Sequence, residues 1–314
     1  MQQLRSSLPS LTNFLHTFAS SPSTFRLLTT ITSTSPFPPS PTQSPPSTPF
    51  LPPPKTLYVL DSSFNPPTRA HLRIATSALL HDTHPTTPPK RLLLLLATQN
   101  ADKAPKPASF EHRLIMMQIF AHDLLSTLSS QTQTQTQSNP SNPSPPPEEE
   151  ITIDIGVTKL PYFHSKAQSI TSSSTYPEET TQIHLLGYDT LTRLLDTKYY
   201  APTHSLAVLR PFLSRHRIRV TYREGSGDEY GDRQAQDRYV RELGEGKREF
   251  EGGEREWVVG GRIEMVEGRK EGEEVISSTR VRGAATAGDK ELLDKLVTKG
   301  VREWVLGEKL YLDD

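Results

Sequence analysis

The chain has 314 residues, of which 33% are hydrophobic and 28 are proline, so part of it cannot belong to a packed core. The net charge of −1 gives no overall field that would attract nucleic acid or an anionic membrane, and the absence of cysteine excludes disulfides, thiolate catalysis and cysteine-ligated zinc. The longest apolar run, Leu92 to Ala97, is far shorter than the roughly 20 residues of a membrane span. We therefore expect a protein of the cytoplasm or nucleus with neither nucleic-acid nor membrane partners.

Residues 1–54 are predicted to form a segment separate from the main domain. They contain no aspartate or glutamate, and residues 32–54 are rich in serine, proline and threonine. Apolar side chains recur four and three residues apart, which predicts a short amphipathic helix. These side chains are Leu4, Leu8, Leu11, Leu15 and Phe18. We expect this peripheral helix to be followed by a disordered linker to Lys55; a mitochondrial transit peptide is the less favoured alternative, because the first 50 residues contain only two arginines.

Residues 55–314 are predicted to form the main domain, in which strand-like and helix-like segments alternate. The expected strands lie at 57–60, 91–98, 151–157, 183–186 and 217–223, with a last strand within 257–266, and the expected helices lie at 70–80, 109–125, 188–195, 278–287, 289–299 and 301–306. Low-complexity or polar insertions are expected at about 127–150 and 224–256, the second with a helix near 234–243. The strand at 151–157 alternates apolar and polar residues, so we expect it to have one covered face. The pattern predicts an α/β fold, a Rossmann-like doubly wound, mostly parallel sheet with helices on both faces.

The stretch from Lys55 to Ala75, KTLYVLDSSFNPPTRAHLRIA, has the order strand, loop, helix. In such a unit the loop follows the carboxyl end of a strand and enters a helix N-terminus, where unpaired N–H groups and the helix dipole favour an anion. After Asp61 the loop contains no acid and offers several hydrogen-bond donors. These are Ser62, Ser63, Asn65, Thr68 and His71. The composition predicts a phosphate site, whereas the alternative is ordinary turn chemistry with a structural histidine.

A second segment, ISSTRVR at residues 276–282, also lies at a predicted junction between a strand and a helix. The hydroxyl and N–H groups of Ser278 and Thr279 lie at the start of the helix, and Arg282 follows one turn later. All three could therefore face one polyphosphate, whereas Arg280 is expected to face solvent. The alternative is an N-capped helix with a surface arginine.

A third segment, LGYD at residues 186–189, follows the expected strand at 183–186. Asp189 could accept hydrogen bonds from ribose hydroxyls, with Gly187 letting the backbone approach a ligand closely. The alternative is an aspartate that caps the next helix. No cluster of histidine, aspartate and glutamate indicates a metal bound by the protein alone.

Together these three segments carry a resemblance to a known family. SSFNPPTRAH at residues 62–71 resembles the signature G-x-F-x-P-x-H/T-x-G-H of the nucleotidylyltransferase superfamily, and FNPP before the helix is most similar to nicotinamide mononucleotide adenylyltransferases. Residues 276–282 match that family's I-S-S-T-x-x-R, and residues 186–189 are similar to its L-x-G-x-D. The insertions and the acid-free N-terminus resemble fungal nicotinamide mononucleotide adenylyltransferase-like proteins. The resemblance covers residues 55–307 without the insertions.

The resemblance implies transfer of AMP from ATP, supplied as its Mg²⁺ complex, to nicotinamide mononucleotide, giving NAD and pyrophosphate. In this family the last histidine of the signature, here His71, contacts the phosphates in the transition state. Thr68 stands in place of the first histidine. Ser62 and Ala70 replace two glycines of the signature, which favours lower turnover. The residues that the resemblance assigns to catalysis are His71, Thr68 and Arg282, and those that it assigns to ATP or its phosphates are Ser62, Ser63, Phe64, Asn65, Gly187, Asp189, Ser278 and Thr279.

The resemblance also places a phosphate-contacting lysine at Lys103, with Lys106 as a competitor. Arg113 on the next helix is a further candidate, and all these charges could instead be solvated. In the family an aromatic side chain stacks on the nicotinamide ring, and this position falls on Tyr200 or else Tyr199. The alternative is that the two tyrosines pack at a helix end.

Two other functions remain open at this stage. The first is the same fold with another acceptor, such as nicotinate mononucleotide or phosphopantetheine. The second is an ATP-binding regulatory protein with weak ATPase activity and a degenerate transferase motif, supported by Ser62, Thr68 and Ala70. A homo-oligomer is compatible with the sequence.

Overall fold

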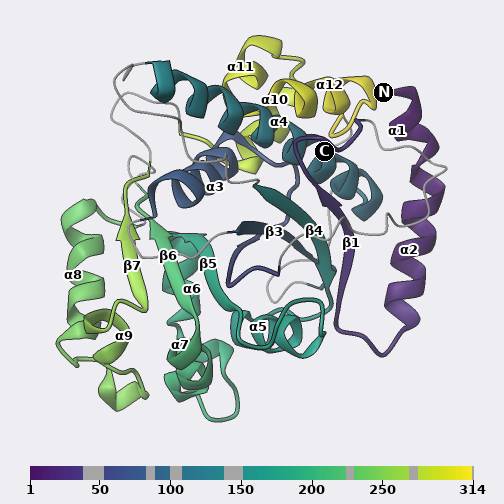
Figure 1. Cartoon of the computed structure of the whole chain (residues 1–314). Helices are drawn as coiled ribbons and strands as arrows, with labels where there is room; N and C mark the ends of the chain where they lie inside the picture. Colours follow the sequence, from purple (N-terminus) through teal and green to yellow (C-terminus); the bar gives the residue numbers. More distant parts are fainter. Residues whose placement is uncertain are drawn as a thin grey trace.

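The computed structural model describes residues 1–37, 53–82, 89–99, 108–137, 151–223, 230–268 and 275–312. The strands in these ranges are β1 Phe25–Ile31, β2 Thr56–Asp61, β3 Lys90–Ala97, β4 Thr152–Thr158, β5 Thr181–Gly187, β6 Arg217–Thr221 and β7 Ile263–Val266. They form one sheet with the order β1-β4-β3-β2-β5-β6-β7 (Figure 1). All neighbouring strands are parallel except β1 and β4. The chain moves outward from β2 through β3 and β4, then crosses to the other side of β2, so the topological switch point lies between β2 and β5.

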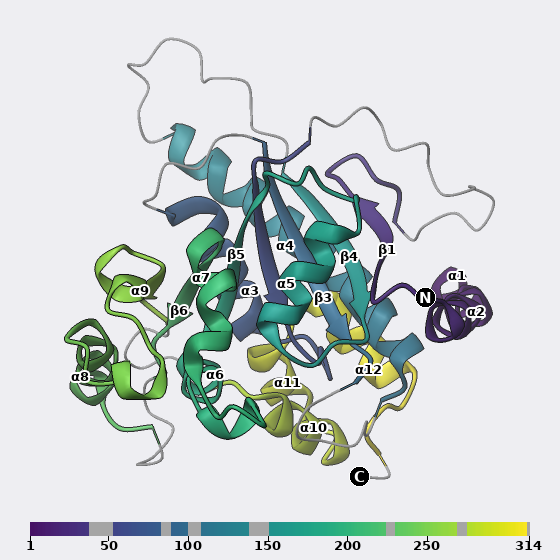
Figure 2. The ribbon, with the colours of Figure 1, turned by 90° about the horizontal axis from the view of Figure 1, so that it is seen from below.

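Helices cover both faces of this sheet. They are α1 Gln2–Ser6, α2 Leu8–Ser20, α3 Arg69–His81, α4 Phe110–Gln137, α5 Phe163–Ser172, α6 Tyr188–Leu194, α7 Arg210–Arg215, α8 Arg233–Gly244, α9 Glu256–Val259, α10 Ser278–Thr286, α11 Lys290–Leu296 and α12 Lys299–Gly307, with 3-10 turns at Thr197–Tyr199, Leu206–Leu209 and Glu249–Glu251. Figures 1 and 2 show α3, α4 and α10 to α12 on one face, α5, α6 and α7 on the other, and α8 and α9 beyond β7. The doubly wound α/β fold predicted from the alternating segments is confirmed.

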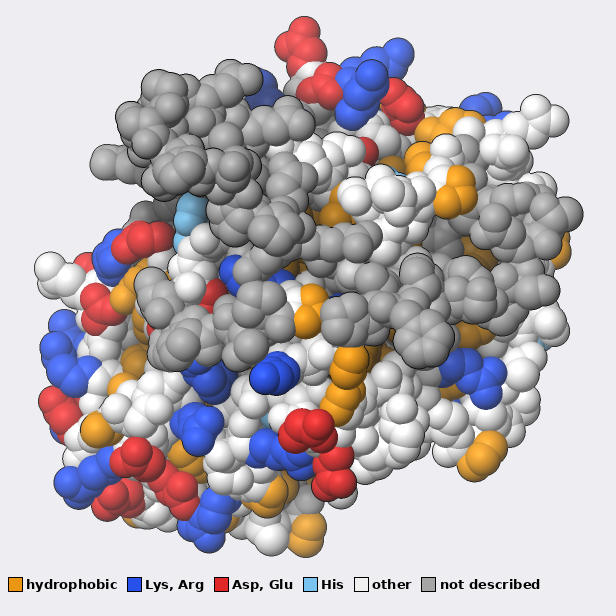
Figure 3. Space-filling view, in the orientation of Figure 1, with side chains coloured by type: hydrophobic (Ala, Val, Ile, Leu, Met, Phe, Trp, Pro, Cys, Tyr) orange, Lys and Arg blue, Asp and Glu red, His pale blue; other side chains and the backbone are white. Residues whose placement is uncertain are grey.

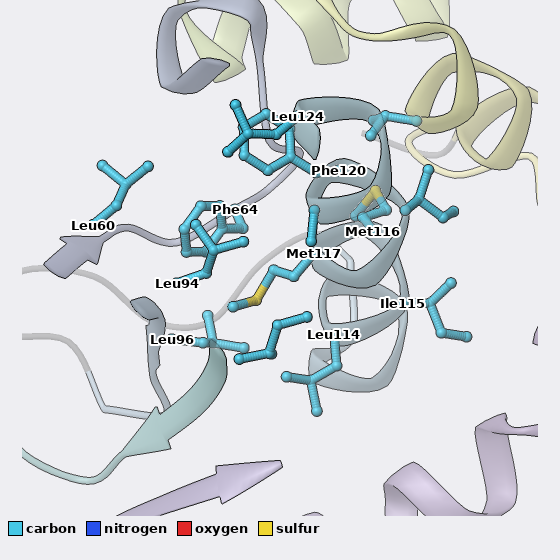
Figure 4. Packing of buried hydrophobic residues seen from close by; sticks show 14 of the residues in the cluster. Leu60, Phe64, Leu94, Leu96, Leu114, Ile115, Met116, Met117, Phe120 and Leu124 are labelled. Atoms are coloured by element: carbon cyan, nitrogen blue, oxygen red, sulfur yellow. The ribbon is translucent and has the colours of Figure 1, made fainter. Parts of the chain in front are cut away.

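The core lies on both faces of β3, whose apolar run is fully buried as its sequence indicates. Leu94 and Leu96 face α4, where Met117 and Phe120 pack against them (Figure 4). Leu93 and Leu95 belong to the cluster on the other face, which α5 covers. The strand β4 is buried along its whole length, so the expectation of one covered face is wrong. Its polar residues Thr152, Asp154 and Thr158 are all buried as well.

The N-terminal residues are part of this domain. The predicted helix is present as α1 and α2, and Leu4, Leu11 and Phe18 are buried in the main core. The expected disordered linker is wrong for Phe25–Ile31, which forms β1 and pairs antiparallel with β4. The β-branched and apolar residues of this segment fit an edge strand, although the surrounding serines and threonines resemble a linker. Residues 38–52 lie outside the described ranges.

The structure also changes the picture of the helix expected at 109–125 and of the insertion expected at 224–256. The helix expected at 109–125 continues to Gln137, so the insertion expected from residue 127 is helical at its start. The last strand lies within 257–266 as expected, as β7, while the first residues of that segment belong to α9, which was not expected. The insertion expected at 224–256 contains the predicted helix as α8, and this helix buries Val240 and Leu243 beside Trp257 in a second core cluster. The helices α5 and α7 were not predicted.

Charged side chains of both signs are interspersed on the face shown in Figure 3, over the part that α7, α8 and α9 occupy. This mixture agrees with the net charge of −1. Within the described ranges, no helix combines the length and the hydropathy that crossing a membrane requires.

Candidate active site

The loop between β2 and α3 is anchored at its centre. Phe64 has a left-handed backbone, with φ of 44°, and its ring is fully buried beside α4 (Figure 4). Asn65 precedes a cis proline, and its Oδ1 accepts a 3.0 Å hydrogen bond from the Tyr311 hydroxyl. The Ser62 N–H donates to the carbonyl of Leu95 at 3.2 Å. The predicted loop residues Phe64 and Asn65 thus fix the path of the backbone rather than expose their side chains.

His71 lies in the first turn of α3 and forms a capping box with Thr68. The Thr68 N–H donates to His71 Nδ1 at 2.9 Å, so Nδ1 is an acceptor and the proton of the neutral ring is on Nε2. Nε2 lies 2.9 Å from Ser62 Oγ and donates to it. Burial lowers the pKa of His71 to about 4, so the ring is neutral near pH 7. The side chain is therefore an uncharged donor held in a fixed orientation at the loop.

The other two hydroxyls of the loop differ in their surroundings. Thr68 is 1% exposed, and its Oγ1 lies 2.9 Å from His71 Nδ1 within the capping box. This hydroxyl therefore already has a partner inside the protein. Its expected contact with a phosphate stays a prediction. Ser63 is exposed at the surface of the loop.

The start of α10 docks onto the same loop. Ser278 Oγ donates to the carbonyl of Pro66 at 3.2 Å, and Arg282 Nη1 donates to the carbonyl of Asn65 at 3.1 Å. Arg282 Nη2 lies 3.2 Å from Thr279 Oγ1. The two predicted phosphate segments, more than two hundred residues apart, are thus brought together. The hydrogen-bond donors of both segments and the N-termini of α3 and α10 lie at the loop between β2 and α3. Such a group of donors favours the binding of an anion.

Arg280 does not join this group. Its Nη1 donates to the carbonyl of Val275 at 2.6 Å, and the residue is half-buried rather than solvent-facing as expected. The Ser277 hydroxyl caps α10 by accepting from the Arg280 N–H at 3.2 Å. The alternative of an N-capped helix is therefore correct for Ser277, while Ser278 and Arg282 reach the loop.

A pocket opens beside this loop at the carboxyl ends of β5 and β6. Gly187 and Asp189 line it, and Asp189 Oδ1 accepts from Arg223 Nη1 at 2.9 Å. A Cβ on Gly187 would lie 2.9 Å from Asp189 Oδ1, so any other residue here would require this carboxylate to shift. The other lining residues are Ala70, Arg73, Ile74, Thr221, Tyr222, Gly268, Val275 and Ile276. The three sequence motifs therefore surround one pocket, and Ile74, Val275 and Ile276 give it apolar walls next to the carboxylate.

The two tyrosines expected at the acceptor have different environments. Tyr200 is 6% exposed, and its hydroxyl donates to the carbonyl of Leu194 at 2.6 Å. Its ring centroid lies 5.9 Å from that of His164 and 6.3 Å from that of Tyr162, both at the start of α5. Burial raises the pKa of Tyr200, so its hydroxyl stays protonated. Tyr199 is half-buried and packs against the cluster that contains Tyr200, with Lys198 Nζ 5.0 Å from its ring centroid.

The remaining candidates contribute less to the described site. Lys103 and Lys106 lie outside the described ranges. Arg113 is buried rather than solvated, and its Nε donates to the carbonyl of Ala108 at 2.8 Å. Among the residues that the structure describes, no group of three or more histidine, aspartate or glutamate side chains is arranged to hold a metal ion.

Sequence reasoning missed the residues that α5 contributes, because this helix was not predicted. Tyr162 and His164 stand beside Tyr200, and burial lowers the pKa of His164. Lys166 forms an ion pair with Asp61 at the end of β2. The only signal in the sequence was the cluster of aromatic and histidine residues at 162–164, which no motif singled out.

Comparison with known proteins decides the family. No family model matches the chain. A protein of Schizosaccharomyces pombe (strain 972) named "Putative nicotinamide mononucleotide adenylyltransferase" is 33% identical over 252 residues, covering 79% of this chain and 82% of that protein. The chain belongs to the nicotinamide mononucleotide adenylyltransferase family.

Two solved structures are also similar to this adenylyltransferase family member. One is Plasmodium falciparum nicotinic acid mononucleotide adenylyltransferase complexed with NaAD, with a TM-score of 0.46 and 14% identity over 82% of this chain and 98% of that chain. The other is the same protein complexed with APC, with a TM-score of 0.45, 13% identity and the same coverage of both chains. The family resemblance identified from the three motifs is confirmed, and the protein is a nucleotidyltransferase.

Proposed function

We propose that this enzyme transfers AMP from ATP to nicotinamide mononucleotide, giving NAD and pyrophosphate. The observation that supports this most strongly is the meeting of His71, Ser278 and Arg282 at one loop, next to the pocket that contains Asp189. Magnesium enters with the substrate as MgATP, held largely by phosphate oxygens and water.

In the proposed reaction a phosphate oxygen of nicotinamide mononucleotide attacks the α-phosphorus of ATP in line. The new bond joins that oxygen to the α-phosphorus, and the bond from the α-phosphorus to the bridging oxygen breaks, so pyrophosphate leaves with the electron pair. The enzyme has little covalent chemistry to perform, and it acts by positioning and by stabilising negative charge. His71 Nε2–H and the Arg282 guanidinium are the donors placed for this task.

The pocket beside the loop is assigned to the adenosine part of ATP. Asp189 can accept from ribose hydroxyls, since Oδ1 pairs with Arg223 while Oδ2 has no hydrogen-bond partner within the part of the chain that the structure describes. Ile74, Val275 and Ile276 offer apolar contact to a base. The acceptor ring is assigned to the neighbourhood of Tyr162, His164 and Tyr200, where aromatic faces can stack on a pyridinium.

The identity of the acceptor is tested by chromatography. The purified protein is incubated with MgATP and either nicotinamide mononucleotide or nicotinate mononucleotide, and dinucleotide and pyrophosphate are measured. We expect NAD at a higher kcat/KM than the nicotinate product, because the rings that contact Tyr200 belong to a tyrosine and a neutral histidine, which do not pair with a carboxylate as a cation would. A larger kcat/KM for nicotinate mononucleotide would replace the proposed acceptor, and ATP hydrolysis without either dinucleotide would favour the regulatory function.

A further inference from the structure

Asp61 and Lys166 form a buried ion pair beside the phosphate loop. Asp61 is the last residue of β2, and Lys166 lies in the first turn of α5. Lys166 Nζ pairs with Asp61 Oδ2, and only 6% and 7% of the two side chains are exposed. Lys166 Nζ also lies 5.3 Å from the ring centroid of Phe163. Neither charge belongs to the motifs that assign the phosphate site.

The position of Asp61 is unfavourable for an anion site. Asp61 directly precedes Ser62, whose hydroxyl contacts His71. A carboxylate at this point would repel a polyphosphate bound to the loop, and the repulsion is stronger in a poorly hydrated environment than in water. A buried carboxylate also needs a partner, because an unpaired buried charge is strongly unfavourable. Lys166 supplies both the partner and the cancelling charge.

We propose that Lys166 sets the affinity of the phosphate site for polyphosphates by neutralising Asp61, and that it is therefore a positioning residue for adenylyl transfer. The identity of MgATP as the physiological ligand rests on the proposed function. The charge argument itself applies to any polyphosphate at this loop, including inorganic pyrophosphate.

The proposal predicts opposite effects for the two partners. Lys166→Met leaves Asp61 unpaired and is expected to raise the Kd of inorganic pyrophosphate and of MgATP by about tenfold or more. Asp61→Asn leaves the ammonium of Lys166 available to the anion and is expected to lower both Kd values several-fold. The double variant, in which both charges are absent, is expected to bind within about threefold of the wild type. Binding is measured by titration calorimetry, with the thermal midpoint of every variant recorded.

Two further variants keep the test decisive if Lys166→Met folds poorly. Lys166→Arg retains the charge and is expected to bind pyrophosphate within about threefold of the wild type. Arg91→Met removes the cation near another buried carboxylate, Asp154, whose Oδ2 lies 3.7 Å from Arg91 Nη1. Arg91 lies near the start of β3, at the amino ends of the parallel strands, whereas the loop lies at their carboxyl ends. This control is expected to lower the thermal midpoint and leave the Kd of pyrophosphate unchanged.

A purely structural ion pair would give a different pattern. The proposal is overturned if Lys166→Met and Asp61→Asn change the Kd of pyrophosphate in the same direction, or if the double variant binds as weakly as Lys166→Met. Failure of the proposed function is distinguishable, because pyrophosphate binding needs no acceptor. If the Kd of pyrophosphate shifts in opposite directions in the two variants but no dinucleotide forms, the charge argument stands and the proposed function fails. If dinucleotide forms but the Kd values do not shift in this way, the charge argument is excluded.

Discussion

The Ser62 hydroxyl lies 2.9 Å from Nε2 of His71 and takes the one proton that the neutral imidazole can donate. In the signature that residues 62–71 resemble, this position is a glycine, which has no side chain to accept that proton. Ser62 therefore competes with a bound phosphate for the donor that the proposed reaction uses. We therefore expect serine in place of glycine at this position to lower turnover, which a substitution can test.

We predict that Ser62→Gly raises kcat. The substitution removes the competing acceptor, so His71 Nε2–H can donate to a phosphate without first breaking a hydrogen bond that contributes about 1 kcal/mol. An increase of about three- to tenfold in kcat is expected from steady-state assays of NAD formation. Ser63→Gly is the matched control, because Ser63 is exposed and it is the Ser62 hydroxyl that contacts His71 Nε2. Equal effects of the two substitutions would show that backbone flexibility, not the hydroxyl, is responsible.

The second prediction concerns the two arginines of α10. Arg282→Met removes a guanidinium that contacts the loop through the carbonyl of Asn65, and kcat is expected to fall by about 10² or more because charge stabilisation in the transition state is lost. Arg280→Met removes the same charge from a side chain that donates to Val275 instead. We expect a change of less than about threefold in that variant, by the same assay. Comparable losses would contradict the assignment of Arg282.

The third prediction is a loss of stability in acid. His216 is 4% exposed, its Nδ1 accepts from the Gln182 N–H at 3.1 Å, and burial lowers its pKa from 6.5 to about 4. A histidine whose pKa is lowered on folding stabilises the native state above its unfolded pKa, and this contribution is lost as the pH falls from 6.5 to 4. By pH 5 the loss is about 2 kcal/mol for His216. His71 titrates in the same direction.

Urea unfolding between pH 7.5 and 5 measures this effect. His216→Gln keeps an acceptor that can face the Gln182 N–H and cannot titrate, so the fall in unfolding free energy with decreasing pH should become shallower. A wild type whose unfolding free energy stays constant over this range would contradict the buried neutral histidines.

The fourth prediction concerns the N-terminal helices. Phe18 is 1% exposed in the main core, with the ammonium of Lys159 5.0 Å from its ring centroid. Phe18→Ala is expected to lower the unfolding free energy by about 3 to 5 kcal/mol, because it leaves a cavity in a packed core. Phe250→Ala is the control, since Phe250 is 85% exposed and its loss should change stability by less than about 0.5 kcal/mol. A Phe18 variant as stable as the control would mean that residues 1–37 are not part of the domain.

The sequence was sufficient for the parts of the fold where local pattern and burial agree. The continuous apolar run of β3 and the motif at the end of β2 predicted parallel strands and the loop at their carboxyl ends. The strand β1 could not be predicted, because a segment containing Phe25 and several threonines gains its structure by pairing with β4, more than a hundred residues away. The burial of β4 on both faces likewise depends on distant parts of the chain, since α4 packs against its apolar residues, β1 pairs along its edge, and the Tyr176 hydroxyl donates to the buried Asp154.

The candidate site likewise contains residues that the sequence predicted and contacts that it could not predict. His71 and Arg282 were predicted from motifs, and their shared loop confirms that the two segments meet. The contact of Ser62 with His71 depends on side-chain geometry that no motif contains. Lys166 was missed because α5 has a weak helical pattern and because its partner, Asp61, was interpreted only as the end of a strand.

The central claim, that His71 donates to phosphate in adenylyl transfer, is tested most directly by rapid-quench measurement of a single turnover. Wild type and His71→Ala are mixed with MgATP and nicotinamide mononucleotide, and NAD is quantified over time, with the Kd of MgATP measured separately. We predict a rate constant at least about 10²-fold lower in the variant with a Kd changed much less, since the donor acts mainly in the transition state. An unchanged rate constant would remove His71 from the mechanism.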